Sequence, residues 1–221
     1  MKKLLWVLSL ALIPLYAVGA QGQTIITYDG NVWETGGFPP SAVGDVLSGV
    51  GYISDVFPPL TWDTSLYEYT WYVSGLTSLG ESVNGSEVTV VYTGGEFQIY
   101  VDDFAPIGTA GTYGTNPPNA TTPSTWIDAT ADPNYLHGDF TSFTQVFNTA
   151  SNTGNWEGTL FFDSGTFVNN VGTQDGYTFT ASIGPPFPPE GYDNQGAGNI
   201  FLTPNSTQES TWGQIKGLYS N

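Results

Sequence analysis

The chain has 221 residues, of which 20 are acidic and only three are basic, so its formal net charge is −17 at pH 7. All three basic residues are lysines, at positions 2, 3 and 216. Nucleic-acid affinity depends largely on Lys and Arg side chains that neutralise phosphates, and anionic membranes attract polybasic patches. The composition therefore predicts that the protein binds neither nucleic acid nor an anionic membrane surface.

Residues 1–20 have the pattern of a secretory signal peptide. Two lysines precede an apolar stretch over residues 4–18, which Pro14 interrupts, and small residues lead up to Ala20. This pattern is typical of a cleaved leader, whereas a spanning helix needs about 20 apolar residues. We expect cleavage after Ala20 and export of residues 21–221 to the periplasm, the cell surface or the medium, with no transmembrane helix in the mature chain. An uncleaved membrane anchor is the alternative.

The remainder of the chain predicts a single all-β domain over residues 21–221. It has no cysteine, so disulfides cannot stabilise it, and frequent glycines and prolines, 28 and 15 in the whole chain, leave no room for a long helix. Between them, apolar and polar residues alternate at the period of a strand. We predict an antiparallel β-sandwich of jelly-roll type. Strands are expected at 45–56, 67–73, 87–101, 135–148, 156–171, 177–183 and 199–203.

Glycines give three local predictions. Gly49 and Gly51 lie on one face of the strand 45–56, where a crossing segment would need the space of their missing side chains. The Gly94-Gly95 pair separates two alternating runs, which predicts a hairpin with a tight turn there. A second hairpin is expected to turn at Ser164-Gly165. These turns would divide the segments 87–101 and 156–171 into two strands each.

The strand expected at 135–148 contains His137, the only histidine of the chain. A lone histidine in a strand is usually a surface or hydrogen-bonded residue, and a zinc site would lack cysteines and further imidazoles. The face that His137 shares with Asp139 is therefore not predicted to be catalytic. Four core-type residues of this strand are expected on opposite faces, Leu136 with Phe140 and Phe143 with Phe147.

Acidic residues are the abundant candidates for a metal site. Asp102 and Asp103 end one expected strand, and Asp132 and Asp139 precede and enter the next. Calcium binds six to eight oxygen ligands, which carboxylates and loop carbonyls supply. We expect these four aspartates to be the candidates for structural Ca²⁺. The alternative is a solvated acidic surface that keeps an exported protein soluble.

Two glutamates give an enzymatic alternative. Glu68 lies in Tyr67-Glu68-Tyr69 and Glu190 in Glu190-Gly191-Tyr192, and these short runs resemble the catalytic strands of the jelly-roll xylanases. The resemblance implies that Glu68 is the nucleophile and Glu190 the general acid/base of a glycosidase. The chain departs from that family in lacking its thumb motif and any arginine to line the cleft.

Tryptophans beside polar loops point to sugar binding. Trp33, Trp62 and Trp126 each have an acidic residue within two positions, Asp128 in the last case. An exposed indole beside Asp or Asn stacks on a pyranose ring while the polar side chain binds its hydroxyls, although such rings also cover the ends of sandwiches. Trp71, which alternates with core-type residues, is expected to pack inside.

The leading hypothesis is an exported, non-enzymatic β-sandwich that binds carbohydrate or a surface polymer and is stabilised by calcium. The acidic glycosidase is the first alternative. An eight-stranded outer-membrane barrel is the second, because alternating strands rich in aromatic residues also fit that class.

Overall fold

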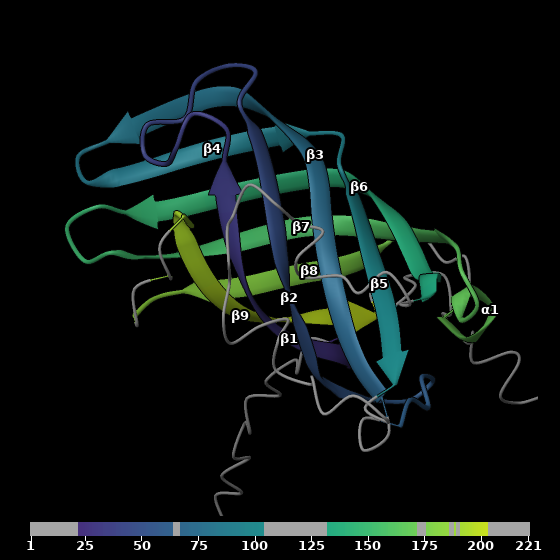
Figure 1. Cartoon of the computed structure of the whole chain (residues 1–221). Helices are drawn as coiled ribbons and strands as arrows, with labels where there is room; N and C mark the ends of the chain where they lie inside the picture. Colours follow the sequence, from purple (N-terminus) through teal and green to yellow (C-terminus); the bar gives the residue numbers. More distant parts are fainter. Residues whose placement is uncertain are drawn as a thin grey trace, which may run out of the picture.

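The structure is a computed structural model, which describes residues 22–63, 67–103, 132–171, 176–185, 188 and 191–202. These ranges hold strands and one short helix (Figure 1). In these ranges, no helix is long and apolar enough to cross a membrane. The elements are β1 (Gln23–Glu34), β2 (Val46–Val56), β3 (Tyr67–Asn84), β4 (Glu87–Thr93), β5 (Glu96–Asp103), β6 (Asp132–Asn148), β7 (Thr153–Ser164), α1 (Val168–Val171), β8 (Tyr177–Ile183) and β9 (Asn194–Leu202).

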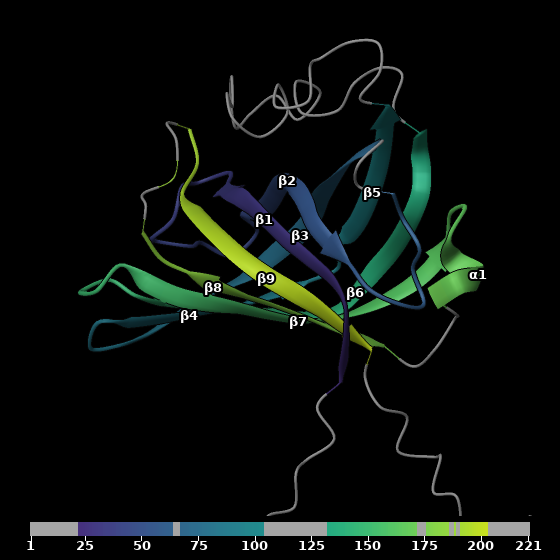
Figure 2. The ribbon, with the colours of Figure 1, turned by 90° about the horizontal axis from the view of Figure 1, so that it is seen from below.

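The strands close into a barrel, and all their pairings are antiparallel. The order around the barrel is β1, β2, β3, β5, β6, β7, β8, β9 and back to β1. The curved wall is seen from below in Figure 2. The all-β prediction is confirmed, but the sandwich was wrong. The alternation of apolar and polar residues shows that one face of each strand is buried. A closed barrel and a pair of stacked sheets both bury that face, so the alternation does not distinguish them.

The Gly94-Gly95 pair is not a hairpin turn. β4 and β5 both pair antiparallel with β3, so the chain keeps its direction through the two glycines. Both have positive φ, 69° and 94°, and they lie beside Gly75 of β3, whose φ is 76°. The actual turn joins β3 to β4 at Gly85. The positive φ values therefore allow a kink between β4 and β5. On one side of the kink β5 lies between β3 and β6, and on the other side β4 occupies that position.

Two further details of the strand predictions were wrong. The segment 156–171 is not a hairpin, because β7 runs straight to Ser164 and continues into α1. Strand β6 shifts its register between Phe140 and Ser142, which indicates a bulge. Since a bulge adds one residue to the strand, the two pairs of core residues turn to the same side. All four are buried: Leu136, Phe140, Phe143 and Phe147.

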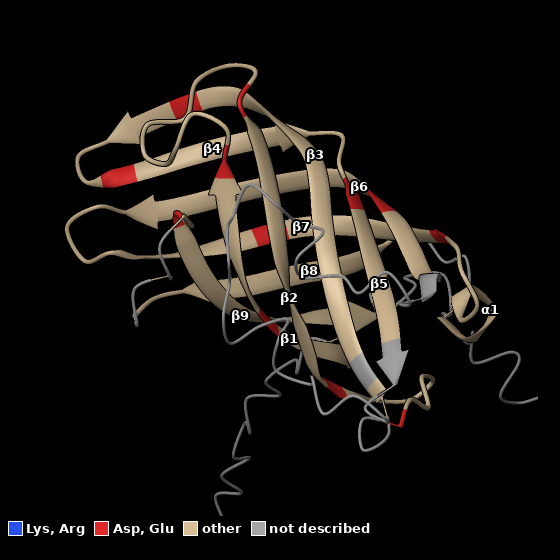
Figure 3. Ribbon diagram, in the orientation of Figure 1, with Lys and Arg blue, Asp and Glu red and all other residues tan. Residues whose placement is uncertain are grey.

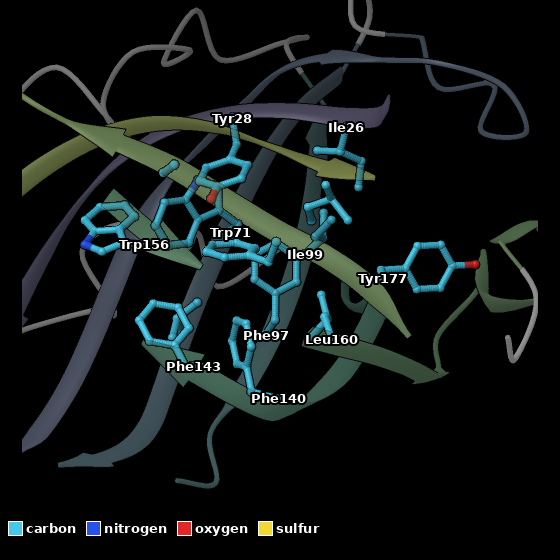
Figure 4. Close-up of a cluster of buried hydrophobic side chains, with 14 of the residues drawn as sticks. Ile26, Tyr28, Trp71, Phe97, Ile99, Phe140, Phe143, Trp156, Leu160 and Tyr177 are labelled. Atoms are coloured by element: carbon cyan, nitrogen blue, oxygen red, sulfur yellow. The ribbon is translucent and has the colours of Figure 1, made fainter. Parts of the chain in front are cut away.

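Aromatic side chains fill the barrel interior (Figure 4). The indole of Trp71, 1% exposed, lies over the backbone of Gly30, Gly49 and Gly51, and its Nε1 donates to the Asp29 carbonyl oxygen at 3.0 Å. The predicted need for space at Gly49 and Gly51 is confirmed, and the indole fills that space. The predicted packing role of Trp71 is confirmed as well.

We predict that Gly30→Ala destabilises the protein by about 1–3 kcal/mol or more, the typical cost of overpacking a core. A Cβ at residue 30 would lie 2.1 Å from Trp71 Cζ2 and 2.4 Å from the Val50 carbonyl oxygen, so backbone as well as ring must move. Urea unfolding measures the change. Gly184→Ala is the matched control, because a Cβ there meets nothing within 4 Å. Equal stability of the two variants would contradict this account of the interior.

Candidate functional site

A pocket of about 230 Å³ lies at one end of the barrel. It forms there because the pairings of β1, β9, β8, β7 and β6 bring the end of β8, the start of β9 and the end of β6 to the same rim. The segment after β1 contributes Phe38 and Pro39. The remaining lining residues are Phe147, Ser151, Asn152, Ile183, Gly184, Pro185, Pro188, Asp193, Asn194 and Gln195. We call this hollow the mouth pocket.

A buried glutamate lies next to the mouth pocket. The side chain of Glu34, 4% exposed, continues the inward positions of β1 and is held by hydroxyl donors. Ser41 Oγ donates to Glu34 Oε1 at 2.5 Å, and Tyr92 OH donates to Oε2 at 3.2 Å. Burial raises the pKa of the Glu34 carboxyl, although these two hydrogen bonds act in the opposite direction. The carboxyl is thus held in a hydroxyl-lined niche.

Asp193 links this buried group to the pocket lining. Its Oδ2 accepts a hydrogen bond from the backbone N of Glu34 at 2.7 Å, and its own N donates to the Val32 carbonyl oxygen at 2.9 Å. These bonds fix the segment before β9 against the end of β1. Burial raises the pKa of the Asp193 carboxyl as well. A carboxyl group with a raised pKa in a pocket marks a candidate binding or catalytic site.

Polar atoms without partners lie at the same end of the barrel interior. Asn194, which lines the pocket, is 4% exposed, and its Nδ2 has no hydrogen-bond partner among the described residues. The same holds for both amide atoms of Gln145 and for Nε1 of Trp156, which pairs with Gln145 across β6 and β7. A buried polar group left without a partner costs about 1–3 kcal/mol, so native proteins rarely retain one without a reason. A ligand or water that enters the pocket would supply the missing partner of Asn194.

The electrostatic character of the site is acidic. The described strands carry aspartates and glutamates but no lysine or arginine (Figure 3). An anionic ligand entering the mouth pocket would meet the carboxyl of Asp193, and no cation of the described chain would balance its charge. The site therefore favours neutral or cationic ligands.

Two of the three tryptophans predicted to bind sugar are described, and they are not brought together. Trp62 is 8% exposed and stacks on Tyr69 within the main core, with the ring centroids 4.6 Å apart. Trp33 instead belongs to a small cluster with Val50 and Tyr192, outside that core. Trp62 therefore has a packing role, which was the alternative to sugar binding. Trp126 and Asp128 lie outside the described residues.

The four predicted calcium ligands do not share one place. Asp102 and Asp103 end β5, and Asp132, at the start of β6, pairs with Val101 of β5. Asp139 lies seven residues farther along β6, a separation of about 23 Å at the rise of a strand. It pairs with Glu96 at the opposite end of β5. Asp139 thus belongs to a different part of the barrel wall.

Only one of the two proposed glycosidase glutamates lies among the described residues. Glu68 lies on β3, where its backbone pairs with that of Asp102, and Glu190 lies outside the described residues. Their proposed catalytic roles stay a prediction. Comparisons of the chain with protein-family models, with curated proteins and with solved structures found no match.

Sequence reasoning missed Glu34, Asp193 and Asn194 as site residues. One signal was available for Glu34, because it stands at period two from Tyr28 and Val32 and so faces inward on β1. A glutamate at a core position is rare unless it is paired or functional. No local pattern could join it to Asp193, which lies 159 residues away along the chain.

We predict that Glu34→Gln reduces the loss of stability between pH 5 and pH 7. The folded-state pKa of Glu34 is raised, so the folded state holds its proton more tightly than the unfolded state. The free energy of unfolding therefore falls as pH rises through the interval between the two pKa values. Glutamine mimics the protonated acid and has no such transition. Urea unfolding at both pH values measures the difference.

Glu87→Gln, at an exposed position at the start of β4, is the control and should keep the wild-type pH dependence. If Glu34→Gln followed the same pH profile as the wild type, the buried carboxyl would not contribute to it.

Proposed function

We propose that the protein is an exported binding protein whose mouth pocket holds a small, neutral, polyhydroxylated ligand, such as one residue of a carbohydrate or surface polymer. The observation that carries this proposal is the buried amide nitrogen of Asn194, which lacks a partner among the described residues, on a side chain that lines the pocket beside the carboxyl of Asp193. Ligand hydroxyl groups both donate and accept hydrogen bonds, so one hydroxyl can satisfy the amide while another donates to the carboxylate.

The apolar side of the pocket supports the same class of ligand. The rings of Phe38 and Phe147 meet edge to face, with centroids 5.5 Å apart, and both line the pocket. A sugar presents C–H groups on its faces and hydroxyls around its edge, which fits a site with aromatic and polar walls. The volume of about 230 Å³ is below the range of about 300–1,000 Å³ found for drug-sized ligands. It favours a single sugar unit or the end of a chain.

Binding is favoured over hydrolysis. A glycosidase needs two carboxyl groups that flank the scissile bond. Among the described residues that line the mouth pocket, Asp193 is the one with a carboxyl group, while Glu34 lies behind it with its oxygens occupied by Ser41 and Tyr92. The described lining can orient a hydroxylated ligand, but it offers no second exposed carboxyl.

The distribution of side chains also bears on the outer-membrane alternative. The inward positions of β7 and β8 carry residues such as Trp156, Phe162 and Phe179, and the outward positions carry polar residues such as Glu157 and Thr180. Outer-membrane barrels show the reverse pattern, with an apolar band outside and a polar interior. The described strands therefore favour a binding protein over a membrane-spanning barrel.

We predict that Asn194→Ala lowers affinity for the ligand by about 5- to 100-fold while the unliganded protein stays at least as stable. The affinity falls because a hydrogen bond to the ligand is lost, and stability is kept because the amide nitrogen has no partner to lose. A glycan array identifies ligands of the mature protein, and isothermal titration then compares the variant with the wild type.

Trp33→Ala is the control for the site first predicted from the sequence, and it should keep wild-type affinity. Loss of binding in Trp33→Ala together with full binding in Asn194→Ala would place the sugar site on the outer wall and contradict the mouth pocket.

A further inference from the structure

A second group of chemically active side chains lies on the outer wall, away from the mouth pocket. Glu96 begins β5, while His137 and Asp139 stand two residues apart on β6 and so face the same side. The register places Glu96 directly opposite Asp139. Asp163 lies near the end of β7, next to the residue that pairs with His137. Three strands thus bring one imidazole and three carboxylates together.

The distances in this group are short. One donor atom each from Glu96, His137 and Asp139 can be chosen so that all three lie within 4.8 Å of one another. His137 Nε2 is 3.7 Å from Glu96 Oε2, and His137 Nδ1 is 2.7 Å from Asp163 Oδ1. Ser164 Oγ donates to the same Asp163 oxygen at 2.9 Å, which helps to hold that carboxylate in place.

The hydrogen bond between His137 Nδ1 and Asp163 determines the role of the other ring nitrogen, Nε2. When Nδ1 donates its proton to Asp163, the neutral imidazole presents the lone pair of Nε2 to Glu96 and Asp139. A nitrogen lone pair and two carboxylates then face one another, which is unfavourable unless Nε2 takes up a proton or a metal cation lies between them. In metal sites, a histidine ligand commonly donates its second ring N–H to a carboxylate in this way.

We propose that Glu96, His137 and Asp139 bind one divalent transition-metal ion, of which Zn²⁺ is the probe, with Asp163 as the positioning residue. An imidazole with two carboxylates suits such ions, whereas Ca²⁺ prefers six to eight oxygens. Ligand distances of about 2.0–2.2 Å allow donor atoms up to about 4.4 Å apart. His137 Nε2 and Glu96 Oε2, 3.7 Å apart, already lie within that range.

This site differs from the calcium site expected from the sequence. It shares only Asp139 with that set, and it uses the histidine that sequence reasoning took for an ordinary surface residue. The absence of cysteines and of further imidazoles counted against zinc, but carboxylates complete a zinc site as well. The register of β5 against β6 supplies them.

The test uses the single imidazole of the chain as its reporter. Mature protein, purified without a histidine tag and freed of metal with a chelator, is titrated with Zn²⁺ at neutral pH while the ¹⁵N-labelled imidazole is followed by NMR. Since His137 is the only histidine, its two nitrogen signals need no further assignment. We expect saturation at one equivalent with the metal on Nε2 and the proton on Nδ1, and no displacement by excess Ca²⁺.

Variants measured by calorimetry give an independent reading. His137→Gln should lose high-affinity Zn²⁺ binding, and Asp163→Asn should weaken it by about 10- to 100-fold. Glu157→Gln, an exposed glutamate elsewhere on β7, should bind like the wild type. Equal affinity of His137→Gln and wild type would show diffuse binding to the acidic surface and overturn the proposal. So would an Nε2 that stays protonated at saturating Zn²⁺, because the group would then be a simple ion pair.

Discussion

The indole of Trp71 occupies the barrel interior over a row of glycines, and much of the structure depends on this contact. Gly51 and Gly30 lie side by side on β2 and β1, directly across from Trp71 on β3. Gly196 of β9 continues the row and receives the ring of Trp156. Because no Cβ stands on this part of the wall, two large indoles fit inside a barrel of small radius. Closure without disulfides then rests on aromatic packing.

This packing also explains why the polar groups gather at one end. Tyr28 and Phe97 contact the ring of Trp71, Phe179 packs against both of them, and together these rings fill the middle of the barrel. Toward the rim at the end of β1, the inward positions change to Glu34 and Asn194. The interior there is too polar to be a simple core and too enclosed to be ordinary surface. Such an end is where a barrel can hold a small ligand.

The two proposed sites use the same wall in different ways. The mouth pocket depends on inward-facing residues at the strand ends, whereas the proposed metal site depends on outward-facing residues of β5, β6 and β7. Because side chains alternate along a strand, neighbouring positions such as Leu136 and His137 contribute to the core and to the outer surface respectively. The two sites therefore can be altered separately by substitution.

The sequence by itself determined the all-β class, the positions of several strands, the inward place of Trp71 and the acidic character of the chain. These properties follow from composition and from the period of two, which are local. Only the tertiary structure decided between sandwich and barrel, turned Gly94-Gly95 from a hairpin turn into a kink, and placed Glu96 beside His137 and Glu34 beside Asp193. Those outcomes depend on strand register and on contacts between distant segments, and an alternating pattern is compatible with many registers.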